Sequence, residues 1–169
     1  MSYFYLKTVG VSISAMVANT ATQVIGTTES DITIFSSETL APIATSSTYP
    51  IITASSATIT FEQGWKYFLD ARIKVVTATP LVADATLRYV FTNASNQVVS
   101  SEGRMTLWRS GSGSVSQEKC CLYIDATSSS QSIKIRGNKI GTSSAVTINA
   151  QDGSNGTTFK SYILIKAWR

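Results

Sequence analysis

The stretch that decides the fold reads Lys66-Tyr67-Phe68-Leu69-Asp70-Ala71-Arg72-Ile73-Lys74-Val75-Val76-Thr77. Every second residue from Tyr67 to Val75 is apolar, and charged side chains stand between them, as at Asp70. A period of two residues places the apolar side chains on one face of an extended strand and the charged ones on the other. The stretch therefore predicts a half-buried β-strand over 66–77, and most later apolar segments repeat its pattern.

The rest of the chain reads as further short strands separated by turns. Glu62-Gln63-Gly64-Trp65 is the turn that leads into the 66–77 strand, and Gly137-Asn138 reads as another turn. No segment shows the 3.6-residue period of an amphipathic helix. The predicted strands lie at about 31–36, 49–53, 57–61, 66–77, 85–91, 97–100, 104–109, 115–126, 133–136, 146–148 and 159–168. Short strands at this spacing are typical of an all-β sandwich or barrel.

The last predicted strand, 159–168, is apolar on both faces. One face carries Tyr162 and Leu164, and the other carries Ile163, Ile165 and Ala167. A strand with this pattern is buried on both sides. It is either a central strand of a sheet within one chain or a strand that also meets other subunits, and the sequence leaves both readings open.

Length and composition fit one domain, with or without an arm. A chain of 169 residues buries about two-thirds of its unfolded surface, so its core needs no disulfide support. Hydrophobic residues make up 43% and charged residues 14%, the latter well below the usual quarter or so, and Ser and Thr take their place. Residues 1–24 read as an N-terminal arm or a first strand of the main sheet, and residues 25–169 as the β-sandwich domain.

The residues needed for catalysis or metal binding are missing or scattered. The chain has no His, which removes Ser-His-Asp and Cys-His devices and every His-ligated metal site. No pair of acids has the spacing of a glycosidase site or a calcium loop. Asp70 is expected to pair with a basic residue of a neighbouring strand. We therefore expect no enzymatic activity, no catalytic residue, no cofactor and no metal.

Cys120 and Cys121 are adjacent, so in a strand their side chains point to opposite faces and a mutual disulfide would be strained. We expect a buried free thiol on one face, with an intermolecular disulfide as the alternative. Two cysteines do not form a disulfide scaffold, so nothing in the sequence demands an oxidising compartment.

The net charge of +4 is unevenly distributed. Residues 1–65 hold one basic residue against four acids, net −3, whereas residues 66–169 hold thirteen basic residues against six acids, net +7. The basic residues are dispersed along strands, which favours solvated strand faces over a nucleic-acid surface. We see no signal peptide and no run of about 18 apolar residues. We therefore expect neither direct nucleic-acid binding nor a membrane segment.

Three segments together resemble the tumour necrosis factor-like jelly roll. They are Gly64-Trp65-Lys66-Tyr67-Phe68-Leu69-Asp70-Ala71-Arg72-Ile73, which is similar to the family's Gly-x-Tyr-aliphatic central strand, Gln131-Ser132-Ile133-Lys134-Ile135-Arg136 before a turn, and the closing Phe159-Lys160-Ser161-Tyr162-Ile163-Leu164-Ile165-Lys166. The resemblance covers roughly residues 25–169 and implies an antiparallel jelly-roll sandwich that forms a homotrimer. It also implies that residues of the central and last strands meet near the three-fold axis, here Tyr67, Leu69, Tyr162, Leu164 and Trp168.

Many proteins of this fold that lack a signal peptide are bacteriophage virion proteins, so the resemblance implies a structural virion protein on the capsid surface. We expect a trimeric capsid decoration (cement) protein whose partners are itself and the major capsid protein. Its N-terminal arm would contact the shell through Tyr3, Phe4 and Tyr5. The alternative is a receptor-binding knob of a tail or head fibre that recognises a cell-surface glycan. Trp65, Trp108 and Trp168 are then the candidate sugar-stacking residues, although such residues are more often core or interface anchors.

Overall fold

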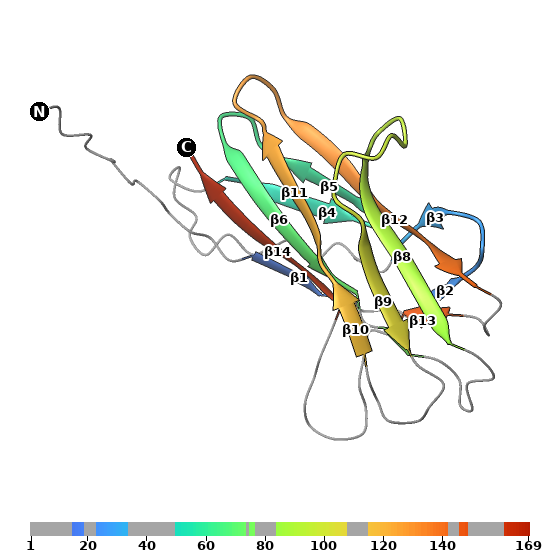
Figure 1. Cartoon of the computed structure of the whole chain (residues 1–169). Helices are drawn as coiled ribbons and strands as arrows, with labels where there is room; N and C mark the ends of the chain where they lie inside the picture. Colours follow the sequence, from blue (N-terminus) through green and yellow to red (C-terminus); the bar gives the residue numbers. More distant parts are fainter. Residues whose placement is uncertain are drawn as a thin grey trace, which may run out of the picture.

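The structure is a computed structural model, and it describes residues 15–18, 23–33, 50–73, 75–76, 84–107, 115–141, 146–148 and 161–169. These residues form antiparallel β-strands and no helix (Figure 1). The strands are β1 (Ala15–Ala18), β2 (Gln23–Ile25), β3 (Ser30–Asp31), β4 (Ile52–Ser55), β5 (Thr58–Phe61), β6 (Lys66–Arg72), β7 (Val75–Val76), β8 (Ala85–Asn93), β9 (Gly103–Leu107), β10 (Val115–Glu118), β11 (Cys120–Asp125), β12 (Gln131–Ile140), β13 (Val146–Ile148) and β14 (Tyr162–Trp168). The all-β prediction is confirmed.

Two larger sheets pack face to face as a β-sandwich. One has the strand order β1-β14-β6-β11, and the other has the order β10-β9-β8-β12-β5-β4 with β3 beside β12. A third, small sheet has the order β2-β13-β7. The part of the chain that the structure describes contains no apolar helix of membrane-spanning length.

The core lies between the inner faces of the two larger sheets. Tyr67 and Leu69 of β6 are fully buried there, as are Phe91 of β8 and Ile135 of β12. The rings of Phe61 and Tyr67 lie 4.7 Å apart and so join β5 to β6 across the sandwich. Because one large buried aliphatic or aromatic side chain contributes about 1.5–3 kcal/mol, this layer is the main source of stability.

The predicted 66–77 strand is shorter than expected. Strand β6 ends at Arg72, and β7 (Val75–Val76) pairs with β13 in the small sheet instead of continuing beside β14. In the sequence, the alternation of apolar residues runs without a break from Tyr67 to Val75. A change of pairing partner does not alter an alternation of apolar residues, so the sequence pattern could not show that β6 ends at Arg72.

The predicted 115–126 strand is two strands in different sheets. Strand β10 pairs with β9 in the larger sheet, whereas β11 pairs with β6 in the four-stranded sheet. Lys119 lies between them at the crossing. The apolar alternation of Cys120, Leu122 and Ile124 begins only after this crossing, and the residues from Ser116 to Lys119 before it are polar.

One predicted turn and one predicted strand near β8 are also wrong. Gly137 lies inside β12, not in a turn, and a Cβ atom there would come within 2.7 Å of the Arg88 carbonyl oxygen. Glycine is required at this position because β12 and β8 approach closely. The predicted 97–100 strand is a single bridge between Val98 and Thr92. The turn at Gly64 is confirmed, with a φ of 93° that suits glycine.

The last strand is central to its sheet. Strand β14 lies between β1 and β6, and Ile163, Ile165 and Ala167 are buried against the core. Residues 15–18 of the predicted arm belong to this sheet as β1, whereas residues 1–14 lie outside the described part of the chain. Of the two readings that the sequence left open, the central position within one chain is the one that the structure shows, and contact of this strand with other subunits stays a prediction.

Candidate functional site

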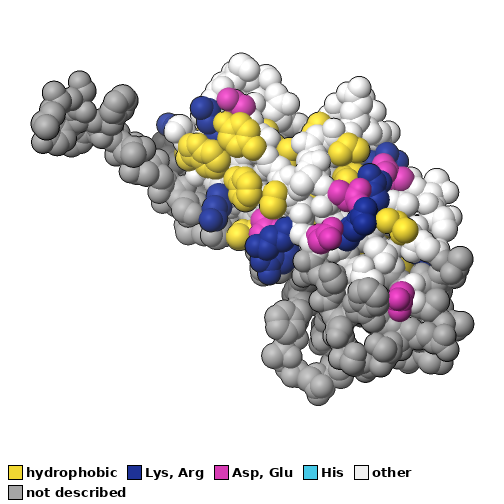
Figure 2. Space-filling view, viewed as in Figure 1, with side chains coloured by type: hydrophobic (Ala, Val, Ile, Leu, Met, Phe, Trp, Pro, Cys, Tyr) yellow, Lys and Arg dark blue, Asp and Glu magenta, His cyan; other side chains and the backbone are white. Residues whose placement is uncertain are grey.

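The outer face of the four-stranded sheet carries a group of large apolar side chains, named here the aromatic face: Phe68 of β6, Tyr123 of β11, and Leu164 and Trp168 of β14. Phe68 is 38% exposed and Tyr123 is 52% exposed, while Leu164 and Trp168 are half-buried. Figure 2 shows hydrophobic side chains gathered over these strands, with Lys and Arg side chains around them. Contiguous apolar surface of this kind marks an interaction site more often than singly scattered residues do.

Strand alternation puts these side chains outside. In β6, Tyr67 and Leu69 point into the core, so Phe68 between them points out. Phe68 lies directly opposite Tyr123 in the register of β6 and β11. The rings of Tyr123 and Trp168 are 5.9 Å apart with a 40° interplanar angle, although β6 separates their strands. The three aromatic side chains therefore form one continuous surface.

Charged groups border the aromatic face at the side of Asp70. The Asp70 carboxylate lies 3.4 Å from Lys119 Nζ and 4.0 Å from Arg72 Nη2. This confirms the predicted pairing of Asp70 with a basic neighbour. Its second oxygen, Oδ1, is buried and accepts no hydrogen bond from the described residues. The arrangement fixes a carboxylate at the edge of an apolar surface, which is a structural role.

The two cysteines lie on opposite faces of β11, and both are free thiols. Cys120 points into the core, where burial raises the pKa of its thiol to about 11. Its Sγ lies 3.1 Å from the carbonyl oxygen of Ser101. Cys121 lies at the margin of the aromatic face. Partial burial raises the pKa of its thiol most, and the negative charge of the nearby Asp70 carboxylate raises it further. Neither thiol is activated as a nucleophile, because activation requires a lowered pKa.

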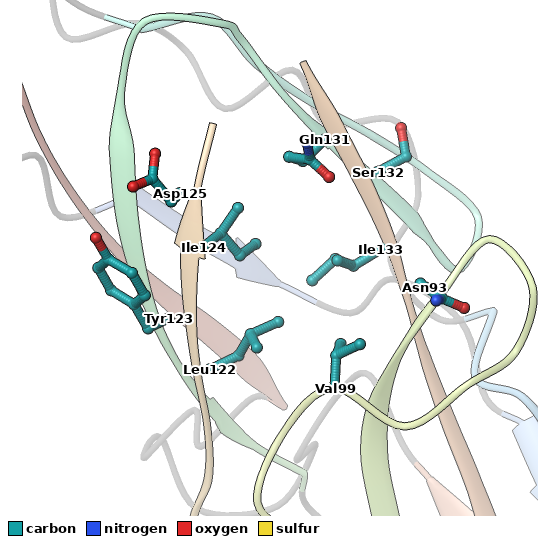
Figure 3. Close-up of a pocket in the computed structure, with 9 residues that line it drawn as sticks. All are labelled: Asn93, Val99, Leu122, Tyr123, Ile124, Asp125, Gln131, Ser132 and Ile133. Carbon is teal, nitrogen blue, oxygen red and sulfur yellow. The ribbon is translucent and has the colours of Figure 1, made fainter. Parts of the chain in front are cut away.

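A pocket opens beside β11, at the edge of the sandwich, with a volume of about 260 Å³. Figure 3 shows Leu122 and Ile124 of β11 pointing toward Ile133 of β12, with Val99 below them, while Tyr123 points away from the pocket. Its rim is polar, with Asn93, Asp125, Gln131 and Ser132 around the opening. A hydrogen bond from Thr127 lowers the pKa of the Asp125 carboxyl, so that carboxyl is ionised at neutral pH.

The main cluster of charges elsewhere ties a loop to the larger sheet. Arg136 Nη1 donates to Glu29 at 2.9 Å and Arg136 Nε donates to Asp31 at 3.0 Å. Arg88 donates to both Glu29 and Glu102, and the hydrogen bond from Arg88 lowers the pKa of Glu102. The described residues hold no group of three or more potential metal ligands. The acids of this cluster are engaged by arginines, which anchors the segment around Glu29 to the sheet.

The structure separates the predicted interface residues into three groups. Tyr67 and Leu69 are fully buried in the chain's own core, so they offer no surface to another subunit. Leu164 and Trp168 belong to the aromatic face, and the backbone of Tyr162 lies in the same strand. The predicted shell-contact residues Tyr3, Phe4 and Tyr5 lie outside the described residues. The burial of Tyr67 and Leu69 does not fit an interface role for them, and the exposed large apolar side chain of β6 is Phe68; an interface role for the other residues stays a prediction.

Sequence reasoning missed Phe68 and Tyr123. Their signal is an apolar residue at a position where the alternation of the strand calls for a polar one, with Phe68 between Tyr67 and Leu69 as the example. Of the three tryptophans considered for sugar stacking, Trp65 is buried beneath Arg169, whose guanidinium lies 4.5 Å from its ring centroid. Trp108 lies outside the described residues, and Trp168 is on the aromatic face.

Comparisons of the chain with protein-family models, with curated proteins and with solved structures found no match. Its function therefore has to be argued from its own surface and strand order. The aromatic face is the feature that most needs a partner, because covering about 100 Å² of exposed ring contributes about 2.5 kcal/mol.

Proposed function

We propose that the protein is a structural component of a bacteriophage virion, a homotrimeric decoration (cement) protein on the capsid surface. The observation that carries the proposal is the aromatic face. Phe68, Tyr123 and Trp168 form one apolar surface, and Phe68 and Tyr123 are left exposed by the residues that the structure describes. Aromatic residues are enriched at the buried centres of protein interfaces. In this proposal, the aromatic face is the contact surface between subunits.

The strand order supports a jelly roll as the fold of each subunit. The chain passes repeatedly between the two larger sheets: β5 is followed by β6, β10 by β11 and β11 by β12 in the opposite layer, whereas β4–β5 and β8–β9–β10 each stay within one sheet. Strand β12 returns to lie between β5 and β8, and β14 returns to lie between β1 and β6. Long connections that bring a later strand beside an earlier one are the Greek-key winding on which a jelly roll is built.

The surface composition supports a role in assembly. With only 14% charged residues, contact with another protein removes few ions from water, and that desolvation is the main cost of burying charge. In this proposal, the outer face of β6, β11 and β14 meets the neighbouring subunits. The N-terminal residues Tyr3, Phe4 and Tyr5 lie toward the major capsid protein. An obligate interface of this type buries about 2,000 Å² or more.

Native mass spectrometry tests the trimer. We expect a species near three times 18.1 kDa that persists on dilution. Phe68→Glu should release monomers, because a carboxylate would be buried without a partner. The matched control is Val24→Glu on β2, where the side chain is 64% exposed on a different sheet, and it should leave the trimer intact. A wild-type chain that remains monomeric would contradict the proposal.

Capsid stability tests the cementing role. Capsids that carry the protein should withstand heat and osmotic shock better than capsids that lack it, and the Phe68→Glu protein should restore less of that resistance than Val24→Glu. If bare capsids are as resistant as complete ones, the protein does not act as cement, even if it is trimeric.

The second candidate function is a receptor-binding knob that recognises a cell-surface glycan. The observation that favours it is the Tyr123–Trp168 ring pair, which lies near the charged Asp125 and Lys66. Exposed rings beside polar groups can stack on sugars. The two functions make opposite use of one face, which is buried in the trimer but open in the knob. A glycan array separates them: hits lost on Trp168→Ala support the knob, whereas no hits together with binding to bare capsids support the cement protein.

A further inference from the structure

Strand β11 has an open edge beside the pocket. At its start the edge is covered by Ser101: the Ser101 N–H donates to the Cys121 carbonyl at 3.2 Å, and the Cys121 N–H donates to Ser101 Oγ at 2.9 Å. On the opposite side, the Ala126 N–H donates to the Trp65 carbonyl at 2.9 Å. Backbone groups alternate in direction along an antiparallel strand. The N–H and C=O groups of Tyr123 and Asp125 therefore point away from β6, like those of Cys121.

No described residue covers those groups. Neither the Tyr123 backbone nor the Asp125 N–H and C=O groups bond to another described residue outside the β6 pairing. The apolar pocket of about 260 Å³ lies directly beside this edge and is lined by Leu122, Ile124 and Ile133. Proteins ordinarily cover or charge such edges, because an open edge pairs with any available strand. An added strand would here find backbone partners and a place for its inward-facing side chains.

We propose that the occupant of this edge is residues 2–7 of a neighbouring subunit, Ser2-Tyr3-Phe4-Tyr5-Leu6-Lys7, added to β11 as an extended strand. This inference rests on the proposed trimer. In an added strand alternate side chains point to opposite faces. With Phe4 and Leu6 directed into the pocket, Tyr3 and Tyr5 extend the aromatic face beside Tyr123. Lys7 then lies close to the pocket rim, where Asp125 is ionised.

The register of the sheet favours a neighbouring subunit over the same chain as the source. Ala15, the first described residue, pairs with Ile165, which pairs with Leu69, which pairs with Leu122 of β11. The start of β1 is thus level with the pocket but at the opposite edge of the same sheet. A segment reaching its own β11 would have to cross a face of the sheet, about 14 Å wide at about 4.8 Å per strand. In the proposed trimer, we place the β11 edge of an adjoining subunit where the segment reaches it without such a crossing.

The length of the segment is sufficient. Fourteen residues precede Ala15, and they span up to about 46 Å when extended. Residues 8–14 alone can bridge about 23 Å between β1 of one subunit and β11 of the next. The inference reassigns Phe4 from the capsid shell to the neighbouring subunit. Tyr3 and Tyr5 lie on the outer face of the added strand, beside Tyr123.

A double-cysteine experiment in the full-length chain tests the inference. Phe4→Cys is combined with Val99→Cys, which lines the pocket, in a Cys121→Ser background that removes the partly exposed native thiol. Mild oxidation should join different chains and give covalent dimers and trimers on a non-reducing gel, because a disulfide forms only when the Cα atoms lie within about 7 Å. The matched control pairs Phe4→Cys with Ile51→Cys, which is 63% exposed directly before β4, and should give no such products.

The possible results separate this inference from the trimer itself. Native mass of the unoxidised protein reports the trimer independently. A trimer without the Phe4–Val99 cross-link would overturn the added strand and leave the proposed function standing. A cross-link confined within single chains would overturn the neighbouring subunit as the source. In the native-cysteine chain, Phe4→Asp should weaken the trimer at least tenfold, whereas Ser2→Asp should change it less than twofold, and equal effects would also count against the inference.

Discussion

Cys120 contributes to the pH dependence of the free energy of unfolding, because its thiol is buried in the core. A thiol in an unfolded chain has a pKa of about 8.5, and in the folded core the pKa rises to about 11. The unfolded chain therefore loses this proton first as pH rises. The neutral thiol's contribution is complete below about pH 8.5 and is lost as pH passes 11.

The first prediction follows from that sign. The free energy of unfolding, measured by urea denaturation, should fall between about pH 8 and pH 11. Cys120→Ala should flatten part of this fall, because the titrating group is gone. Tyr67, whose pKa is also raised by burial, continues to contribute at the alkaline end. Native Cys120 should resist iodoacetamide until the chain unfolds. A Cys120→Ala curve parallel to the wild-type curve would contradict the assignment.

A second prediction at this scale concerns Gly137. A Cβ atom at this position meets the Arg88 carbonyl oxygen at 2.7 Å, and a backbone atom cannot move aside without separating β12 from β8. Gly137→Ala should therefore lower the free energy of unfolding by about 1–3 kcal/mol. Gly26→Ala is the matched control, since no atom lies within 4 Å of its added Cβ, and it should be neutral or slightly stabilising. Equal effects at the two glycines would show that the strand approach is not the cause.

At the scale of elements, the two faces of β6 differ: one is buried in the core and the other is exposed. Its inner face supplies Tyr67 and Leu69 to the core, and its outer face presents Phe68. The strand pairs with β14 on one side and β11 on the other, so it supports every residue of the aromatic face. Substitutions on its two faces should therefore fail in different ways.

The third prediction separates those faces. Leu69→Asp should prevent folding, because a carboxylate would be buried without a partner in the core. Phe68→Asp, one residue away, should give a folded chain, because that side chain is 38% exposed. Soluble expression and circular dichroism distinguish the two. A soluble, β-rich Leu69→Asp protein would contradict the assignment of the inner face.

At the scale of the whole molecule, the described strands enclose a core, whereas no described residue covers the outer aromatic face or the edge of β11 at Tyr123. The inner faces of the two larger sheets pack against each other in one apolar cluster, and Arg136 binds the segment around Glu29 to the sheet. The aromatic face and the edge at Tyr123 lie next to each other, since Tyr123 belongs to both. Assembly through this corner would bury both features at once.

The fourth prediction concerns the forces that hold the proposed trimer. An apolar interface depends little on ionic strength, whereas exposed ion pairs are screened by salt. Raising NaCl from about 0.1 M to about 1 M should leave the dissociation constant of the trimer unchanged or slightly lower. Sedimentation across this range measures it. Dissociation at high salt would point instead to charged contacts, such as those of Lys119 or Lys166.

The sequence by itself determined the fold class and the inward faces of most strands. The alternation in 66–72 reports burial on one face directly, so Tyr67, Leu69 and Ala71 lie in the core as the period of two requires. The opposed cysteines and the outward position of Asp70 followed from the same local geometry, whereas Lys119 as the partner of Asp70 comes from another segment. These positions depend on neighbours along one strand, which a sequence records.

Only the tertiary structure decided which strands pair and which surface remains open. The change of sheet after Arg72 keeps the alternation intact, so the pattern could not show it, and the crossing at Lys119 lies in a polar run that carries no signal for the sheet partner. Tyr67 and Leu69 looked equally suited to a core or an interface, because both environments favour apolar side chains. Phe68, Tyr123 and Trp168 lie far apart in the chain, and they become one surface only because the sheet places β6 between β11 and β14.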